Sequence, residues 1–314
     1  GGHHLTYDLS TNSYTISRFY ELKTNPEFEN MKMEEAVPAY GALLTNAISL
    51  RLRADVAVGT CLSGGLDSSS VAPLAAEPYT KAVGDSFRAI TAISELKTND
   101  ESGFAKQVVT HSSMIWLTVK PTYEDFVQIL DEVVRAQEEP FGSPSVCMQF
   151  FVMKTARKHG VPVLLDGQGG DETLLGYERY YIGHFLSLLK RQGIKFAVQS
   201  LIDCRKNNSK MSITKILQFL MYFSSARLRY WNYCYRNRYL RTRLCLPEAM
   251  RLNSKAIWNI QKLQKLEIEQ ANLPHLLRYE DKNSMWHSVE ARLPFLDYRL
   301  VEAAFSLPEE TKIN

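Results

Sequence analysis

A short run rich in glycine and serine separates an apolar segment from a helical one, and this junction constrains the fold more than any other part of the chain. It reads Leu62-Ser63-Gly64-Gly65-Leu66-Asp67-Ser68-Ser69. The preceding residues 55–62 are mostly apolar, as in a buried strand, and residues 68–76 have the pattern of a helix. The sequence therefore predicts a strand, a tight turn and a helix in direct succession.

This turn also carries groups that can hold the pyrophosphate end of ATP together with a magnesium ion. Gly64 and Gly65 lack Cβ atoms, so the backbone N–H groups can approach phosphate oxygens, and the start of the helix adds unpaired donors. Asp67 offers the hard oxygen ligand that magnesium prefers. The residues expected to contact ATP or its pyrophosphate are Leu62, Ser63, Gly64, Gly65, Asp67, Ser68 and Ser69. The simpler alternative is a Gly-Ser turn that caps an ordinary helix.

A second polar loop, residues 166–170, follows the apolar segment 161–165. Open α/β sheets place ligands at the carboxyl ends of their strands, so Asp171 is expected at the same edge of the sheet as Asp67. Two carboxylates there would repel each other unless a cation lay between them, which predicts that Asp67 and Asp171 share a magnesium ion. Asp171 and Glu172 could also cap the next helix, and the two roles are compatible.

Three motifs together resemble one known family. Residues 63–68 resemble the Ser-Gly-Gly-x-Asp-Ser signature of the PP-loop ATP pyrophosphatases, which cleave ATP between its α and β phosphates. Residues 166–177 resemble the Ser-Gly-Glu-Gly-x-Asp-Glu…Gly-Tyr motif of glutamine-hydrolysing asparagine synthetases. Residues 281–297 are similar to that family's Asp-Lys…Val-Glu-x-Arg-x-Pro-Phe-Leu-Asp segment. The motifs occur in the family's order, so the resemblance covers nearly the whole chain.

This resemblance implies a ligase that uses ATP and Mg²⁺ to form a C–N bond. A substrate carboxylate would attack the α-phosphate to give an acyl-adenylate, and ammonia or another amine would then form the amide. Lys282 matches the lysine that contacts the α-phosphate in the family, which makes it the main catalytic candidate. Asp166 and Gly167 are expected to contact ATP. Three further residues are expected to form a buried ion-pair framework that orients the third motif: Glu290, Arg292 and Asp297.

One residue departs from the family pattern at a chemically important position. Asparagine synthetases carry a glutamate where this chain has Gln168, and an amide cannot act as a base. Glu138 and Glu139 match an acidic pair that relatives carry, and either could take the proton or merely hold the loop. Asp166, where the family usually has serine, is a second change in the same loop. These changes place L-aspartate in doubt as the substrate, and a sugar or peptide carboxylate is the alternative.

The pattern of apolar segments predicts an α/β fold with a parallel sheet and helices on both faces. Strands are expected at 55–62, 89–93, 115–119 and 161–165, and helices at 31–53, 68–76, 103–111, 123–135 and 147–158. Pro73 should kink or shorten the helix after the first loop. The expected divisions are a hairpin at 1–23, a PP-loop core at 30–179, a helical lobe at 180–279 and a return segment at 280–314.

The hairpin resembles one that closes the N-terminal glutaminase domain in the family, so we expect such a domain in the full-length protein. We also weigh a homodimer.

The chain has 37 basic and 34 acidic residues, a net charge of only +3. The number of cysteines is odd and they form no C-x-x-C pair, which suits a reducing cytoplasm. They are Cys61, Cys147, Cys204, Cys234 and Cys245. No apolar run is long enough to span a membrane.

The segment from Cys204 to Pro247 is basic, contains no acidic residue and is interleaved with aromatic side chains. It could bind nucleic acid, as in a PP-loop RNA-modifying enzyme. More often the aromatic rings of such a segment face the core, so we expect no nucleic-acid partner.

PP-loop enzymes that thiolate RNA also need a cysteine beside the second or third motif, and this chain has none there. A non-enzymatic scaffold is the third alternative, against which the retained Asp67, Asp171 and Lys282 argue.

Overall fold

The computed structural model describes residues 1–207, 212–236, 252–253 and 255–313. They belong to two compact units. Unit 1 comprises Gly1–Ala36, Leu174–Ala271 and Glu302–Asn314, and unit 2 comprises Val37–Thr173 and Asn272–Val301. All three sequence motifs lie wholly or mainly in unit 2, which is therefore the part of the molecule that can assemble a site from them.

Unit 2 is built around a five-stranded parallel sheet with the strand order β5-β4-β3-β6-β7. Its strands are β3 (Val58–Cys61), β4 (Arg88–Ala92), β5 (Ile115–Val119), β6 (Val163–Leu165) and β7 (Glu290–Arg292). β3 lies at the centre, paired with β4 on one side and with β6 on the other. Because β3 and β6 are parallel neighbours, the two glycine-rich loops leave the sheet side by side at its carboxyl edge.

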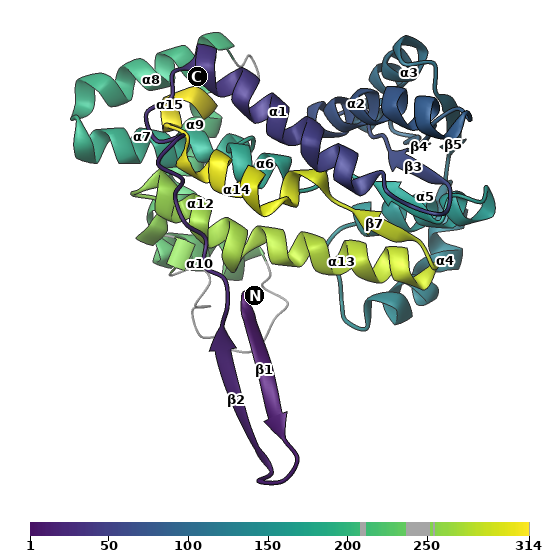
Figure 1. The fold of residues 1–314 in the computed structure, drawn as a ribbon. Coiled ribbons are helices and arrows are strands. Elements are labelled where there is room, and N and C mark those ends of the chain that lie inside the picture. Colours follow the sequence, from purple (N-terminus) through teal and green to yellow (C-terminus); the bar gives the residue numbers. More distant parts are fainter. Residues whose placement is uncertain (208–211, 237–251, 254, 314) are drawn as a thin grey trace. The chain divides into compact units, whose positions relative to one another are not determined.

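Helices flank this sheet. They are α1 (Met33–Arg51), α2 (Leu66–Val83), α3 (Ser102–His111), α4 (Tyr123–Gln137), α5 (Ser145–Lys158), α6 (Gly170–Leu174) and α13 (Asn272–Trp286), with short 3-10 turns η1 (Lys97–Asn99) and η2 (Pro294–Leu296). Figure 1 shows α13 beside β7, and it also packs on α4 and α5. A buried apolar cluster that includes Ile90, Met153 and Leu164 joins the sheet to α5. This packing fixes α13, which carries the start of the third motif.

The structure confirms most of the predicted elements of unit 2 and corrects two points. Strand β7 was not predicted, because its three residues are polar or half-exposed and lie in a charged segment. Helix α2 is not shortened at Pro73 but continues to Val83. Pro73 has no N–H and removes one helical hydrogen bond. The helix persists because its apolar face, including Val71 and Ala75, is fully buried.

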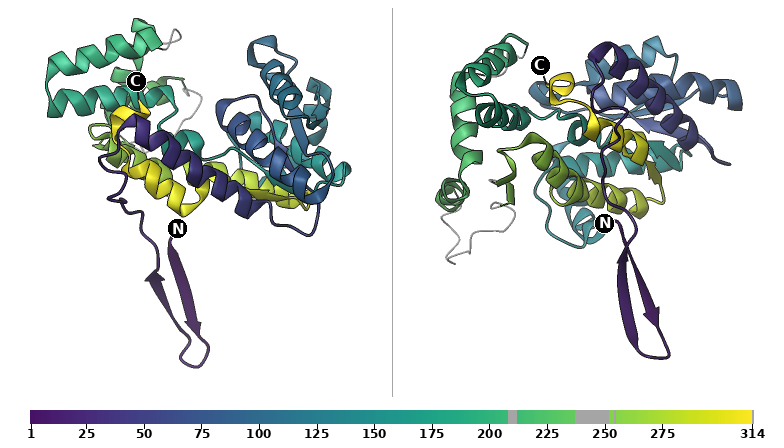
Figure 2. Two further views of the ribbon diagram at one scale, coloured as in Figure 1. Left: turned by 45° about the horizontal axis from the view of Figure 1, so that its top comes forward. Right: turned by 60° about the vertical axis from the view of Figure 1, so that its left-hand side comes forward.

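Unit 1 combines a β-hairpin with a group of helices. Strands β1 (His3–Asp8) and β2 (Ser13–Arg18) pair antiparallel (Figure 1). All their residues are exposed. The helices are α7 (Glu178–Arg191), α8 (Ile194–Asn207), α9 (Ile213–Ser224), α10 (Ala226–Arg236), α12 (Ile260–Glu269), α15 (Glu309–Lys312) and the second half of α14 (Tyr298–Ser306), which begins in unit 2. α7 packs against α8, α9 and α12 through buried side chains such as Tyr180 and Ile182. Figure 2 shows these helices in two further views. Within the described ranges, no helix is both long and apolar enough to cross a membrane.

The basic aromatic segment Cys204–Pro247 takes in the end of α8, all of α9 and α10, and residues 208–211 and 237–247, which are outside the described ranges. For two rings of α10, Trp231 and Tyr235, the expectation that the aromatic side chains face the core is wrong. Trp231 is 67% exposed and Tyr235 is 63% exposed, and their rings stack with centroids 5.7 Å apart. The spacing of four residues places both rings on one exposed face of the helix, where they cover each other.

Candidate active site

Hydrogen bonds within the first loop close it into a compact turn. The Ser63 N–H donates to the Ser68 Oγ at 3.2 Å, and the two hydroxyls are 3.0 Å apart. The Gly65 N–H in turn donates to the Ser63 Oγ at 3.1 Å. Leu62 is buried and anchored to β4, because its N–H donates to the Ile90 carbonyl at 2.9 Å. These serines therefore shape the loop, and Leu62 ties it to the sheet.

Gly64 is required by this turn for two reasons. Its φ of +96° is in the region that favours glycine. A Cβ there would also stand 2.5 Å from the carbonyl oxygen of Glu101. Gly65 is the N-cap of α2 and provides no side-chain cap, so the first N–H groups of the helix keep their capacity to bind an anion. The N–H groups at this turn are therefore of the kind that binds anions at helix N-termini.

The second loop packs directly on the first turn of α2. A Cβ on Gly167 would lie 2.7 Å from the Ser68 nitrogen, and one on Gly170 would lie 2.3 Å from an Asp67 carboxylate oxygen. The backbone N–H of Asp171 donates to the Asp67 carboxylate. The structure thus brings Asp67 and Asp171 together at the carboxyl edge of the sheet.

The electrostatics of this pair favour a bound cation. Burial, followed by the charge of Asp171, raises the pKa of Asp67 to about 7. Among the described residues, no group of three or more His, Cys, Asp or Glu side chains could hold a metal ion. A magnesium ion at this edge would therefore take two carboxylates from the chain and its remaining ligands from phosphate oxygens and water, which is a common arrangement for Mg²⁺.

Gln168 lies in the second loop and is half-buried. Its side-chain amide donates to the Tyr279 hydroxyl at 3.4 Å. Burial raises the pKa of Tyr279 to about 12, so this phenol is neutral at ordinary pH. Where asparagine synthetases carry a glutamate, this chain therefore has a neutral amide, Gln168, in contact with a neutral phenol, Tyr279.

Sequence reasoning missed a buried carboxyl group next to this loop. Glu280, on α13, is 1% exposed and its carboxyl group lies against that of Asp166. Asp166 also contacts the Cys61 thiol and accepts the backbone N–H groups of Gly167 and Gln168. The sequence offered no signal for this contact, because the burial of Glu280 depends on how α13 packs against the sheet.

Lys282 forms an ion pair with Glu138. Glu138 is the C-cap of α4, where it adopts a left-handed φ of 56°, and its bond to Lys282 lowers its pKa. An ionised, paired carboxylate is a weak base, so the contact favours a holding role for Glu138 over a catalytic one. Glu139 pairs with Arg278 at 2.9 Å. The two acidic residues thus attach the end of α4 to α13.

The third motif does not form the single buried framework expected from the sequence. Arg292 pairs with Glu290 at 2.8 Å, but the Glu290 side chain is 60% exposed. Arg292 also donates to the carbonyl groups of Arg51 and Arg53 at the end of α1. Asp297 instead pairs with Arg51 and Arg299. The charges divide into two groups because the short strand β7 points Arg292 toward α1.

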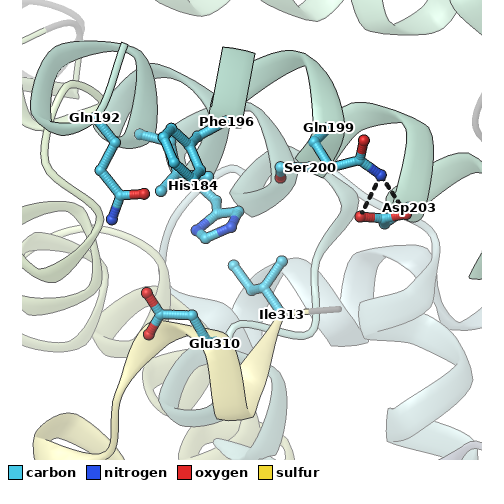
Figure 3. A pocket seen from close by; sticks show the side chains of 9 residues that line it. His184, Gln192, Phe196, Gln199, Ser200, Asp203, Glu310 and Ile313 are labelled. Carbon is cyan, nitrogen blue, oxygen red and sulfur yellow. Dashed lines mark hydrogen bonds between the residues drawn. The ribbon is translucent and has the colours of Figure 1, made fainter. Parts of the chain in front are cut away.

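A pocket of about 540 Å³ in unit 1 contains none of the predicted site residues. Its lining combines carboxylate and amide groups with apolar side chains, among them Gln199, which donates to Asp203 at 3.0 Å (Figure 3). The lining residues are His184, Leu188, Gln192, Phe196, Gln199, Ser200, Asp203, Glu310 and Ile313. The predicted residues Asp67, Gly167 and Asp171 lie instead at the edge of the sheet in unit 2.

Comparison with known proteins agrees with the motifs. The sequence model of the asparagine synthase family matches residues 39–314. A putative glutamine-hydrolysing asparagine synthetase of Mycobacterium tuberculosis is 27% identical over 319 residues, which cover 96% of this chain and 46% of the relative. Asparagine synthetase 1 of Bacillus subtilis is 25% identical over 330 residues, covering 97% and 48%.

A third relative carries a different name. Amidase chyE of Penicillium rubens is 24% identical over 323 residues, which cover 90% of this chain and 47% of the relative. The chain spans about half the length of these curated relatives. Because the family's sequence model matches most of its length, the chain belongs to the asparagine synthase family.

Proposed function

We propose that this chain is the synthetase part of an ATP-dependent amide-forming ligase that acts through an acyl-adenylate. The observation that carries the proposal is the meeting of two glycine-rich loops, at which Asp67 and Asp171 come together beside the uncapped start of α2. An anion-binding turn next to two acidic groups suits a nucleotide phosphate that is bound together with its divalent cation.

Each group has a distinct role in this reaction. Asp67 and Asp171 would hold Mg²⁺, which supplies charge neutralisation for the departing pyrophosphate. The backbone around Gly64 and Gly65 orients that pyrophosphate. Lys282, held by Glu138, places a positive charge where negative charge develops on the α-phosphate. The chain's residues thus mainly position the nucleotide and stabilise the charge that develops on its phosphates, as phosphate chemistry requires.

The substrate is a small carboxylate, and the nitrogen comes from ammonia or another amine. L-Aspartate is one candidate, as the names of the two bacterial relatives suggest. Gln168 and Asp166, which differ from the usual asparagine synthetase residues, favour testing other carboxylates as well. The length and names of these relatives support a glutamine-hydrolysing domain as the ammonia source in the full-length protein.

The products test this proposal. The protein would be incubated with ATP, Mg²⁺, ammonia and a panel of carboxylates, and the phosphorus products followed by ³¹P NMR. We expect AMP and pyrophosphate in amounts equal to the amide that forms. Formation of ADP and phosphate would instead indicate an acyl-phosphate intermediate and would contradict the proposal.

A further inference from the structure

The pocket of about 540 Å³ in unit 1 brings together polar side chains from three helices. His184 comes from α7, Asp203 from the second half of α8, and Glu310 from α15. Figure 3 shows the imidazole ring of His184 in the middle of the pocket, with Glu310 toward one side and Asp203 toward the other. The volume is typical of sites that hold small organic molecules. None of these three residues belongs to the sequence motifs, so the proposed function leaves this pocket unused.

His184 presents a hydrogen-bond acceptor to the pocket. Its side chain is only 7% exposed, and its Nδ1 lies 3.2 Å from a carboxylate oxygen of Glu309. Because an ionised carboxylate can only accept, Nδ1 carries the hydrogen, and Nε2 of the neutral ring is an acceptor. Arg191 also pairs with Glu309 and holds that carboxylate in place. Among the described residues, no group donates to Nε2, although buried polar atoms normally have a partner.

The lining of the pocket is acidic. Two of the described lining residues, Asp203 and Glu310, are acidic, and none of them is lysine or arginine. Asp203 pairs with Lys206 at 3.7 Å, but both side chains are largely exposed, and such pairs contribute little. The charge of Glu310 acts on Lys312, whose amino group donates to the Ala304 carbonyl at 2.7 Å and whose pKa is lowered to about 7 by burial. The pocket therefore favours a ligand that brings positive charge.

The other lining residues favour an organic cation over a metal ion. The Gln199 amide donates to both oxygens of Asp203, at 3.0 and 3.1 Å, and so orients that carboxylate. Phe196 and Leu188 add apolar surface, and an aromatic ring attracts a cation as well as an alkyl chain. In the described ranges, no group of three or more His, Cys, Asp or Glu side chains could hold a metal ion. A ligand with N–H donors and a short apolar part fits these groups best.

We propose that this pocket binds a small organic cation that carries amine or guanidinium groups. An N–H group of the ligand donates to Nε2 of His184, and the carboxylates of Glu310 and Asp203 balance its positive charge. The apolar part of the ligand lies against Phe196 and Leu188. The site is independent of the amide-forming reaction, because it is defined by binding alone and uses none of the residues assigned to that reaction.

Isothermal titration calorimetry with putrescine at low ionic strength tests this proposal. We expect putrescine to bind saturably to one site per chain, whereas butanediol, which has the same carbon chain without the charge, should not bind. Glu310→Gln and Asp203→Asn should each weaken binding about 10- to 100-fold, as expected for loss of a hydrogen bond to a charged group. Glu27→Gln is the matched control, because it removes an exposed carboxylate from unit 1 that does not line the pocket. It should leave the Kd unchanged.

His184 provides a second readout in the wild-type protein. The ¹⁵N resonance of its Nε2 should shift on addition of putrescine, and a His184→Gln variant identifies this signal among those of the seven histidines. An Nε2 resonance that is unchanged at saturation would overturn the inference. Absence of saturable binding, equal affinity of Glu310→Gln and the wild type, or binding of butanediol as tight as that of putrescine would also overturn it. Displacement of putrescine by Mg²⁺ at constant ionic strength would show a metal site instead and would contradict the proposal.

Discussion

Gly167 lies against the backbone of Ser68 so closely that a Cβ at position 167 would stand 2.7 Å from the Ser68 nitrogen and 2.9 Å from the Asp67 carbonyl carbon. The contact joins the loop after β6 to the first turn of α2. Because it involves backbone atoms on both sides, neither loop can yield by turning a side chain. The contact therefore sets the distance between Asp67 and the helix that carries Asp171.

Gly167→Ala should separate the two loops. Overpacking of this kind costs about 1–3 kcal/mol, so we expect a lower melting temperature together with loss of ATP-pyrophosphate exchange. Gly41→Ala is the control, since a Cβ on that α1 glycine meets no atom within 4 Å. It should be neutral or stabilise the fold by up to about 1 kcal/mol. Full exchange activity in Gly167→Ala would show that the loops need not touch.

Magnesium should stabilise the protein in a pH-dependent way. The pKa of Asp67 is raised from 3.8 to about 7 by burial and by Asp171, so the folded state binds more protons than the unfolded state between these pH values. The contribution of Asp67 to the free energy of unfolding should therefore fall as pH rises through this range. Mg²⁺ with pyrophosphate binds the ionised form and should raise the melting temperature at pH 8 more than at pH 5.

Asp67→Asn provides the control for that experiment. It removes the ionisable group, so both the pH dependence and the response to Mg²⁺ should weaken together. The exposed Asp131→Asn variant should behave as the wild type in the same thermal scans. An Asp67→Asn protein that still responds fully to Mg²⁺ would place the ion elsewhere.

Lys282→Ala should slow adenylate formation without unfolding the protein. Loss of a charge that is directed at a transition state costs about 100- to 1,000-fold, and we expect a decrease of that size in pyrophosphate exchange. Lys282→Arg should recover part of the rate. Lys158→Ala, at the exposed end of α5, should leave it unchanged. If the folded Lys282→Ala protein exchanges normally, another cation acts at the α-phosphate.

Gln168→Glu should separate the amide step from adenylation. If a carboxylate at this position assists proton removal, amide formation from aspartate and ammonia should rise by as much as about 100-fold, while pyrophosphate exchange stays nearly constant. Tyr279, which accepts the Gln168 amide now, can donate its O–H to the new carboxylate. An unchanged amide rate would mean that Gln168 is a neutral replacement and that the base lies elsewhere in the site.

The sequence predicted those parts of the fold that have strong local patterns. The strand at Ile115–Val119 agrees residue for residue, and the central strand and the glycine-rich turn before α2 were placed correctly. Glycine next to apolar strands constrains the backbone locally, so no tertiary information is needed. Parallel neighbours then bring Asp67 and Asp171 to one edge, as the strand order implies.

The remaining features depend on contacts between distant segments. Strand β7 has three residues and exists because β6 offers a free edge, which no local pattern can indicate. Glu280 resembles any helical glutamate in sequence and becomes buried only when α13 packs on α4 and α5. Arg292 points to the end of α1 because of β7, so the expected ion-pair framework could not be resolved from the motif alone.

ATP-pyrophosphate exchange across a panel of carboxylates tests the central claim most directly, because it reports adenylate formation without requiring the amide step. The claim predicts that exchange depends on one class of carboxylate and on Mg²⁺, and that it is lost in Asp67→Asn and in Asp171→Asn while Gln168→Glu retains it. Exchange that persists in either aspartate variant, or absence of exchange in the folded wild-type protein with every carboxylate, would contradict the claim.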